Sequence, residues 1–268
     1  MVRERQETVG GRRVRWLEAG PESDRVLVWL HAFPLSAAMW EPQLQAPPPG
    51  WRLVAPDLAG FGGTADHDGP PHIDDFADDL ERLLAHLQAP PVVLGGLSMG
   101  GYAAFAMMRR HPSRVRALIL ADTRAGADSA EARANRGRLL SLVRESGAAG
   151  VATQMLPTLV GETTKRDRPE VVARVRALIE ANSAAGIARA IERLRDRPDS
   201  TPLLKAIAIP VLVVAGAEDV ITPPDAAREL AAALPHGSVA IVPAAGHLSN
   251  LEHPQAFDAA VGGWLAGV

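Results

Sequence analysis

Short runs of consecutive hydrophobic residues recur along the chain, and amphipathic stretches separate them. The runs at 25–30, 91–95, 117–121 and 210–216 have the length and continuity of strands that are buried on both faces. Before the second run, hydrophobic residues recur with helical spacing over about 73–87, at Ile73, Phe76, Leu80, Leu83, Leu84 and Leu87. Strands that alternate with helices predict an α/β fold with a mostly parallel central sheet flanked by helices.

Two local patterns complete the first hundred residues. Residues 8–18 alternate between polar and apolar side chains around Gly10 and Gly11, which is typical of a β-hairpin. Four carboxylates at the start of the helix at 73–87 have the composition of a metal site, but negative charge also stabilises a helix N-terminus. We interpret them as helix-start residues on a solvated face, namely Asp74, Asp75, Asp78 and Asp79.

The alternation of strands and helices stops in one long segment, 123–199. No strand pattern occurs there, and Ala, Arg and Glu recur at helical spacing. We therefore predict a core formed by 1–122 and 200–268, with a cap of about four helices inserted at 123–199 over the strand ends. The residues expected to punctuate these helices are Pro157, Gly161, Pro169 and Pro198.

One serine lies at the junction between a predicted strand and a predicted helix. Residues 96–100 read Gly-Leu-Ser-Met-Gly, directly after the run at 91–95 and before the apolar stretch 101–108. A Gly-x-Ser-x-Gly turn in this setting lifts the hydroxyl out of the sheet and holds it near a helix N-terminus, where negative charge is favoured. We therefore predict that Ser98 is a nucleophile and not an ordinary turn serine.

A serine nucleophile needs a base that takes its proton. The chain has eight histidines, and most fall in polar loops or on predicted helices. His247 is the exception, because it follows the predicted strand 239–242 on a loop beside Gly246. We predict that His247 is the base.

The base in turn needs an acid that orients it. Asp219 follows the buried strand at 210–216, and sites in open α/β sheets form at the carboxyl ends of the strands. Glu218 is adjacent, but its side chain would point elsewhere. Asp122, which ends the strand at 117–121, is the more serious rival, and its alternative role is a turn residue that binds local amides. Asp219 is the predicted acid.

The oxyanion that forms on a substrate carbonyl needs backbone N–H donors. Met99, which follows the nucleophile and begins the helix, is one predicted donor. The second comes from the loop after the first core strand. Pro34 in this loop has no N–H, which leaves Phe33 as the second donor and Ala32 as its alternative. We expect His31, at the start of the loop, to brace it.

These residues together resemble the α/β-hydrolase superfamily. That superfamily places nucleophile, acid and base in this chain order. The likeness covers almost the whole chain: residues 31–34 look like the family's His-Gly-x-x oxyanion loop, 57–64 resemble its Asp-x-x-Gly-x-Gly-x-Ser turn, and 246–254 are similar to its histidine loop. Within the superfamily, the chain looks most like small capped esterases and 3-oxoadipate enol-lactonase-like hydrolases.

Two positions narrow the resemblance. Ala32 stands where the family usually has glycine, and its methyl group disfavours a positive φ and narrows the acyl side of the site. Ser98 occupies the position at which haloalkane dehalogenases and epoxide hydrolases of this superfamily carry aspartate. Their chemistry is therefore not expected here.

Composition and charge restrict the classes of function. The length of 268 residues suits one sizeable domain, and the net charge of −3 gives no reason to expect nucleic acid or an anionic membrane as a partner. There are no cysteines, so disulfides and thiolate chemistry are excluded. The N-terminal residues lack the apolar region of a secretory signal, which favours a cytoplasmic location.

The resemblance implies hydrolysis of small or medium carboxylic esters through an acyl-enzyme, with no metal or cofactor. Lactone (enol-lactone) hydrolysis, a perhydrolase or haloperoxidase side activity and C–C bond hydrolysis are alternatives on the same triad. A ligand-sensing receptor that retains the hydrolase fold is the non-enzymatic alternative. The expected partner is a small ester or lactone, and the oligomeric state stays open. The cap is expected to roof an apolar pocket, and Ala32 together with the cap residues Met155 and Leu156 are its candidate lining residues.

Overall fold

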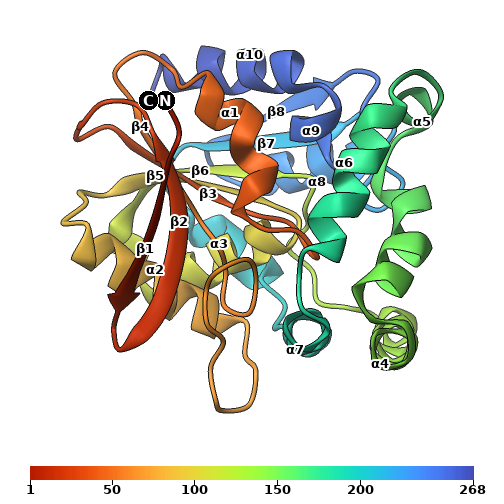
Figure 1. Cartoon of the computed structure of the whole chain (residues 1–268). Helices are drawn as coiled ribbons and strands as arrows, with labels where there is room; N and C mark the ends of the chain where they lie inside the picture. Colours follow the sequence, from red (N-terminus) through yellow and green to blue (C-terminus); the bar gives the residue numbers. More distant parts are fainter.

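The sheet at the centre of the molecule has eight strands, and the computed structural model describes the whole chain, residues 1–268 (Figure 1). The strands are β1 (Arg3–Val9), β2 (Arg12–Ala19), β3 (Val26–Leu30), β4 (Arg52–Pro56), β5 (Val92–Leu97), β6 (Val115–Ala121), β7 (Val211–Gly216) and β8 (Gly237–Val242). Their order is β1-β2-β4-β3-β5-β6-β7-β8. The pairs from β4 to β8 are parallel, whereas β1–β2 and β2–β4 are antiparallel. The predicted fold class and the N-terminal hairpin are confirmed.

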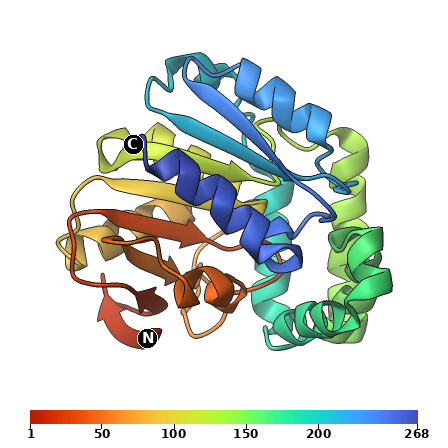
Figure 2. The same cartoon turned by 90° about the horizontal axis from the view of Figure 1, so that it is seen from above.

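Helices cover both faces of this sheet (Figure 2). Outside the segment 123–199 they are α1 (Glu41–Gln45), α2 (Asp74–His86), α3 (Met99–Arg110), α8 (Pro224–Ala232), α9 (Ser249–Glu252) and α10 (Pro254–Leu265). Helices α1 and α10 contact each other, and so do α2 and α3. The helix expected at 73–87 is confirmed as α2. None of the helices combines the length and the apolar character that crossing a bilayer requires.

Strand β4 was not among the predicted strands. Its short apolar stretch lies between Arg52 and Pro56, and the sequence pattern showed only the turn that follows it. In the structure β4 fills the place between β2 and β3, which makes it the point where the sheet changes from antiparallel to parallel pairing. Hydrogen bonds to both neighbouring strands stabilise β4, although its short apolar stretch alone does not indicate a strand.

The segment between β6 and β7 folds into helices that gather at one end of the sheet, at the right in Figures 1 and 2. They are α4 (Ala130–Leu159), α5 (Glu162–Asp167), α6 (Pro169–Glu180) and α7 (Ala184–Arg195). Gly161 is the N-cap of α5 and Pro169 the first residue of α6. Pro157, however, lies inside α4, and the break in this helix occurs at Gly147 (φ 59°, ψ −158°). The punctuation expected at Pro157 is therefore wrong, because a backbone conformation that glycine adopts readily interrupts the helix earlier.

The carboxylates at the start of α2 form ion pairs with arginine side chains from other parts of the chain. The pairs are Asp74–Arg109, Asp75–Arg193, Asp78–Arg110 and Asp79–Arg12. The sequence predicted that these carboxylates lie on a solvated face, but the structure pairs them with basic side chains. One of these side chains, Arg193, belongs to α7. The Asp75–Arg193 contact attaches the segment 123–199 to α2.

Arg193 is the most deeply buried of these cations. Its side chain is fully buried and donates to Asp66 Oδ1 at 2.6 Å, while its guanidinium lies 5.0 Å from the centre of the Phe76 ring. Asp66 belongs to the loop between β4 and α2, so this pair joins α7 to the core. Arg189 also pairs with Asp66, at 2.7 Å, so loss of Arg193 would leave this carboxylate with one cation and would open a cavity where the buried Arg193 side chain packs.

Arg193→Ala is therefore expected to lower the free energy of unfolding by about 2–5 kcal/mol, measured by urea denaturation. The matched control is Arg228→Ala, because Arg228 pairs with Asp225 at 2.7 Å on the exposed face of α8. Exposed pairs of this kind contribute about 0–1 kcal/mol. Equal losses in the two variants would contradict a special role of Arg193 in attaching the cap.

Candidate active site

Strand β5 ends in a sharp turn, and Ser98 stands at the apex of this turn before α3 begins. Its torsions, φ 54° and ψ −110°, lie in a region that residues with a side chain rarely adopt. A Cβ on Gly96 would lie 2.2 Å from the Gly100 carbonyl oxygen, and a Cβ on Gly100 would lie 2.2 Å from that of Leu30. Both glycines of the motif are therefore required by close backbone contacts at the turn.

The structure brings the three predicted catalytic residues together. His247 Nε2 lies 2.9 Å from Ser98 Oγ, and His247 Nδ1 lies 2.8 Å from Asp219 Oδ2. The same carboxylate oxygen accepts the Thr222 hydroxyl at 2.6 Å. Since an ionised carboxylate only accepts hydrogen bonds, this network assigns the ring proton to Nδ1 and leaves Nε2 free to accept the serine hydroxyl.

Asp219 is held in the ionised form. Burial opposes its ionisation, but the electrostatic interaction with the adjacent His247 and the hydrogen bonds from His247 and Thr222 outweigh this effect, so the pKa of Asp219 is lowered. Its second oxygen accepts the backbone N–H groups of Ile221 at 2.8 Å and of Thr222 at 3.0 Å. The side chain is thus oriented at both oxygens and can direct only one hydrogen bond towards His247.

The rival acid, Asp122, makes other contacts. Its Oδ1 accepts the Gly216 N–H at 2.8 Å, and its Oδ2 binds the Ser249 hydroxyl. It is fully buried, and burial together with the nearby negative charge of Asp219 raises its pKa well above the ordinary value. Asp122 therefore joins the strand before Asp219 to the residues after His247, and its partners are distant in the chain instead of the local amides expected of a turn residue.

Glu218 also faces away from His247. Its carboxylate accepts the Thr163 N–H at 2.8 Å and binds the Thr163 hydroxyl. This contact confirms that the neighbour of Asp219 points elsewhere. It also attaches α5 of the cap segment to the loop that carries the acid.

In the loop after β3, the backbone N–H of Phe33 has no acceptor in the chain, whereas those of Ala32 and Leu35 are bonded to Met39 Sδ and to the Ala32 carbonyl. The N–H of Met99 is the first of α3 and has no partner within its own helix. His31 is fully buried, donates from Nδ1 to the Ala32 carbonyl at 3.0 Å and accepts the Leu58 N–H on Nε2 at 3.0 Å. The expectation that His31 braces this loop is confirmed, and burial lowers its pKa and so favours the neutral ring.

A turn residue completes the support of this loop. Asp57 accepts the Ala37 N–H at 2.8 Å and the Gly63 N–H at 2.9 Å, and its carboxylate pairs with Arg15 at 2.7 Å. The turn at 57–64, predicted from the sequence, is thus connected to the segment that follows the oxyanion loop.

Comparisons with known proteins identify the family. A family model described as the alpha/beta hydrolase fold matches residues 25–254. The chain belongs to the α/β-hydrolase family. This result confirms the resemblance that the sequence motifs indicated.

Individual relatives of this α/β-hydrolase match over nearly their full lengths. The 3-oxoadipate enol-lactonase 2 of Acinetobacter baylyi is 32% identical over 90% of this chain and 88% of its own. A thermophilic esterase from Thermogutta terrifontis, solved with malate bound, has a TM-score of 0.93 and 37% identity, covering 99% of this chain and 98% of that one. The enol-lactonase from Burkholderia xenovorans LB400 has a TM-score of 0.88 and 27% identity, covering 98% and 100% of the two chains.

The candidate pocket residues of the hydrolase lie in different surroundings. Ala32 is fully buried, and its φ is not positive, so the methyl group fits without backbone strain. Met155 lines a groove of about 680 Å³ on α4 together with Leu139 and Leu142 from before the Gly147 kink. Leu156 is buried in the hydrophobic core. The groove includes no residue of the triad, and the pocket roles of all three residues stay predictions.

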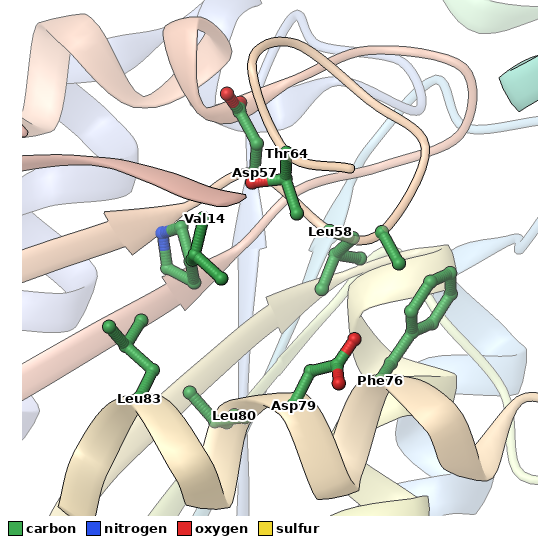
Figure 3. A pocket seen from close by; sticks show the side chains of 10 residues that line it. Val14, Asp57, Leu58, Thr64, Phe76, Asp79, Leu80 and Leu83 are labelled. Atoms are coloured by element: carbon green, nitrogen blue, oxygen red, sulfur yellow. The ribbon is translucent and has the colours of Figure 1, made fainter. Parts of the chain in front are cut away.

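A small cavity lies between the turn that Asp57 organises and α2. Its volume is about 20 Å³, and Asp57 and Thr64 line one side while Leu80 and Leu83 of α2 line the other (Figure 3). This volume has room for about one water molecule. The cavity is too small for a substrate and belongs to the packing between the turn and α2.

Three side chains at the site were not identified from the sequence. Thr222 binds Asp219, as described above. Glu252 accepts the Gly161 N–H at 2.8 Å and the Leu248 N–H at 3.1 Å, which connects the histidine loop to the start of α5. Asn182 connects the end of α6 to the oxyanion loop and to the turn before α2. An asparagine just after a helix is a common helix-end signal, but this pattern does not indicate a distant partner.

The pKa of Asp122 leads to a prediction on stability. An acid whose pKa is raised in the folded state holds its proton more tightly there than in the unfolded chain, whose Asp pKa is about 3.9. Its contribution to stability is therefore lost progressively as the pH rises above about 4. Asparagine keeps the acceptor for Gly216 and gains a donor for Ser249 without titrating.

We expect the melting temperature of Asp122→Asn, relative to the wild type, to rise between pH 5 and pH 8. For a chain of this size, 1 kcal/mol corresponds to about 2–4 °C. Thermal unfolding of both proteins across this pH range measures the difference. A difference that is constant or falls with pH would show that Asp122 is ionised throughout.

Proposed function

We propose that this protein is a serine hydrolase that cleaves small or medium carboxylic esters through an acyl-enzyme. The observation that supports this most directly is the continuous hydrogen-bonded series from Ser98 Oγ to His247 and on to Asp219, at 2.9 and 2.8 Å. These distances allow proton transfer without rearrangement of the side chains. The hydrolase family is established by the comparisons, and the ester substrate and the roles of the residues are the proposal.

In the first half of the reaction, Ser98 Oγ forms a bond to the substrate carbonyl carbon while its proton moves to His247 Nε2. The charge that develops on the carbonyl oxygen is received by the N–H groups of Met99 and Phe33. His247 becomes positively charged, and Asp219 stabilises it through Nδ1. The tetrahedral intermediate then expels the alcohol, which takes the proton from Nε2 as the ester C–O bond breaks.

In the second half, water replaces the alcohol. His247 Nε2 takes a proton from this water as its oxygen attacks the acyl carbon. The same two N–H groups receive the second oxyanion. When the bond to Ser98 Oγ breaks, the proton returns from Nε2 to the serine and the carboxylic acid is released.

Lactone hydrolysis is the second candidate on the same residues. It is favoured by the relative at 32% identity, whose name is 3-oxoadipate enol-lactonase, over 90% of this chain. The chemistry differs only in that the leaving alkoxide stays attached to the acyl group. Ring opening therefore gives a hydroxy-acyl enzyme, or an enol form of it, and water releases the product as before.

The test is a substrate series with active-site labelling. Hydrolysis of p-nitrophenyl esters from C2 to C12 and of aliphatic lactones is measured, and an organophosphonate ester is used to label the nucleophile for peptide mass spectrometry. We expect steady turnover, with the label on Ser98 and its incorporation prevented by substrate. A single stoichiometric burst followed by a stall would instead indicate the ligand-sensing receptor, and label on another residue would contradict the mechanism.

A further inference from the structure

The Ala32–Phe33 peptide group determines where the proposed oxyanion donor points. The Ala32–Phe33 peptide bond is trans, so its C=O and N–H point in opposite directions. The Ala32 carbonyl accepts two hydrogen bonds, from His31 Nδ1 at 3.0 Å and from the Leu35 N–H at 2.9 Å. With the oxygen held on one side, the Phe33 N–H is directed to the other, where it has no acceptor in the chain.

The Leu35 N–H, which donates to the Ala32 carbonyl, belongs to the Pro34–Leu35 peptide group. The carbonyl of this group is the Pro34 oxygen, which accepts one hydrogen bond, from Asn182 Nδ2 at 3.0 Å. An amide that accepts at its oxygen becomes a stronger donor at its N–H, because the hydrogen bond polarises the whole group. The bond from Asn182 therefore strengthens the bond from Leu35 to the Ala32 oxygen.

Asn182 extends this series by one more amide. Its Oδ1 accepts the Gly62 N–H at 3.0 Å, and its Nδ2 also donates to the Leu178 carbonyl at 2.9 Å. The side chain amide is thus satisfied at its oxygen and at its nitrogen, and the residue is only 6% exposed. Its orientation is determined, since exchanging oxygen and nitrogen would oppose an N–H to Nδ2 and a carbonyl to Oδ1.

Three amides therefore stand in series, and the last ends at the proposed oxyanion site. The order is Gly62 N–H to Asn182, Asn182 to Pro34, Leu35 to Ala32, and then the Phe33 N–H. Asn182 is the one member of the series that comes from the segment 123–199. It is separated from Pro34 by 148 positions in the chain.

We propose that Asn182 is a positioning residue through which the cap segment orients and polarises the Phe33 oxyanion donor. This inference rests on the proposed function, because it assigns a role within the oxyanion site. A displacement of α6 that broke the bond to Pro34 would release the Pro34–Leu35 group and weaken the donor. Substrate that moves the cap would then change the rate of the chemical step, and not only its own binding.

The experiment compares three variants with the wild type. Asn182→Asp cannot donate to Pro34, and Asn182→Ala removes the same donor without adding a charge. Asn135→Asp is the matched control, because Asn135 is exposed on α4 of the same segment. Active sites are titrated with an organophosphonate ester, so that kcat is expressed per folded, reactive site. The inhibition constant of an alkylboronic acid, which forms a tetrahedral adduct on the serine, reports on the oxyanion site.

We expect kcat per titrated site to fall about 10-fold in both Asn182 variants, which is less than the roughly 10²–10³-fold loss caused by removing an oxyanion donor. The inhibition constant of the boronic acid should rise by a similar factor. KM should change less than about twofold, since the donor acts mainly in the transition state. Asn135→Asp should match the wild type. A structural role alone would lower the fraction of titratable sites and the melting temperature without changing kcat per site.

The inference is overturned if either titratable Asn182 variant keeps wild-type kcat, or loses kcat without weaker binding of the boronic acid. This failure is distinguishable from failure of the proposed function. If Ser98→Ala retains turnover, the serine mechanism itself is wrong. If Ser98→Ala is inactive while the Asn182 variants behave as wild type, only the role of Asn182 is wrong.

Discussion

Ser98→Ala is expected to lower kcat/KM for a p-nitrophenyl ester by about 10⁴-fold or more, with little change in stability. The hydroxyl is the atom that forms the acyl-enzyme, and alanine has no atom that can replace it. His247 and Asp219 would remain hydrogen-bonded to each other but would have no proton to transfer. Residual activity would come from direct attack of water on the ester, with the oxyanion donors stabilising the charge on the carbonyl oxygen.

The measurement compares initial rates of the two purified proteins across the ester series, with thermal unfolding as the control for folding. Ser98 Oγ makes one hydrogen bond, to His247, and the side chain is partly exposed, so its loss should not unfold the protein. Retention of more than about a tenth of the wild-type rate would rule out the acyl-enzyme at Ser98.

Asp219→Asn is expected to lower kcat by about 10³–10⁴-fold. An asparagine amide that turned its NH₂ towards His247 Nδ1 would require Nδ1 as an acceptor. The ring proton would then move to Nε2, which faces Ser98 and could no longer accept the serine proton. The geometry of the site would be kept, because asparagine has the shape of aspartate, while the base would hold its proton on the wrong nitrogen.

Asp122→Asn is the matched control for this variant. Both aspartates are buried at the ends of neighbouring strands, but Asp122 binds Gly216 and Ser249 and makes no hydrogen bond to His247. Since asparagine can satisfy both of these partners, we expect kcat to change less than about 10-fold. The reverse ranking, with the larger loss in Asp122→Asn, would make Asp122 the orienting acid.

The nucleophile turn could be predicted because its sequence motif is local, with Gly96 and Gly100 within two residues of Ser98. Gly96 is required by the Gly100 carbonyl inside the turn, whereas Gly100 is required by the Leu30 carbonyl of β3. Continuous apolar runs likewise indicated β3, β5, β6 and β7, since a strand buried on both faces has no polar positions to interrupt it. Strand β4 was missed because its apolar stretch is too short to stand out between Arg52 and Pro56.

The choice between Asp219 and Asp122 required the tertiary structure. Both residues follow buried strands, so their positions in the sequence do not distinguish them. The structure separates them by direction, since one carboxylate reaches His247 and the other turns to Gly216 and Ser249. The direction of a side chain at the end of a strand depends on the conformation of the loop that follows. That conformation is determined by contacts with residues far away in the sequence.

The sequence by itself determined the alternation of strands and helices apart from β4, the serine turn and the residues available as base, acid and oxyanion donors. These features depend on side-chain type and on contacts within a few positions. Only the tertiary structure decided which donors are free and what holds them. Asn182 reaches Pro34 across 148 positions, and Glu252 reaches Gly161 across 91. Such hydrogen bonds cannot be recognised from the sequence pattern, because each depends on one polar atom that is placed by the packing of two distant segments.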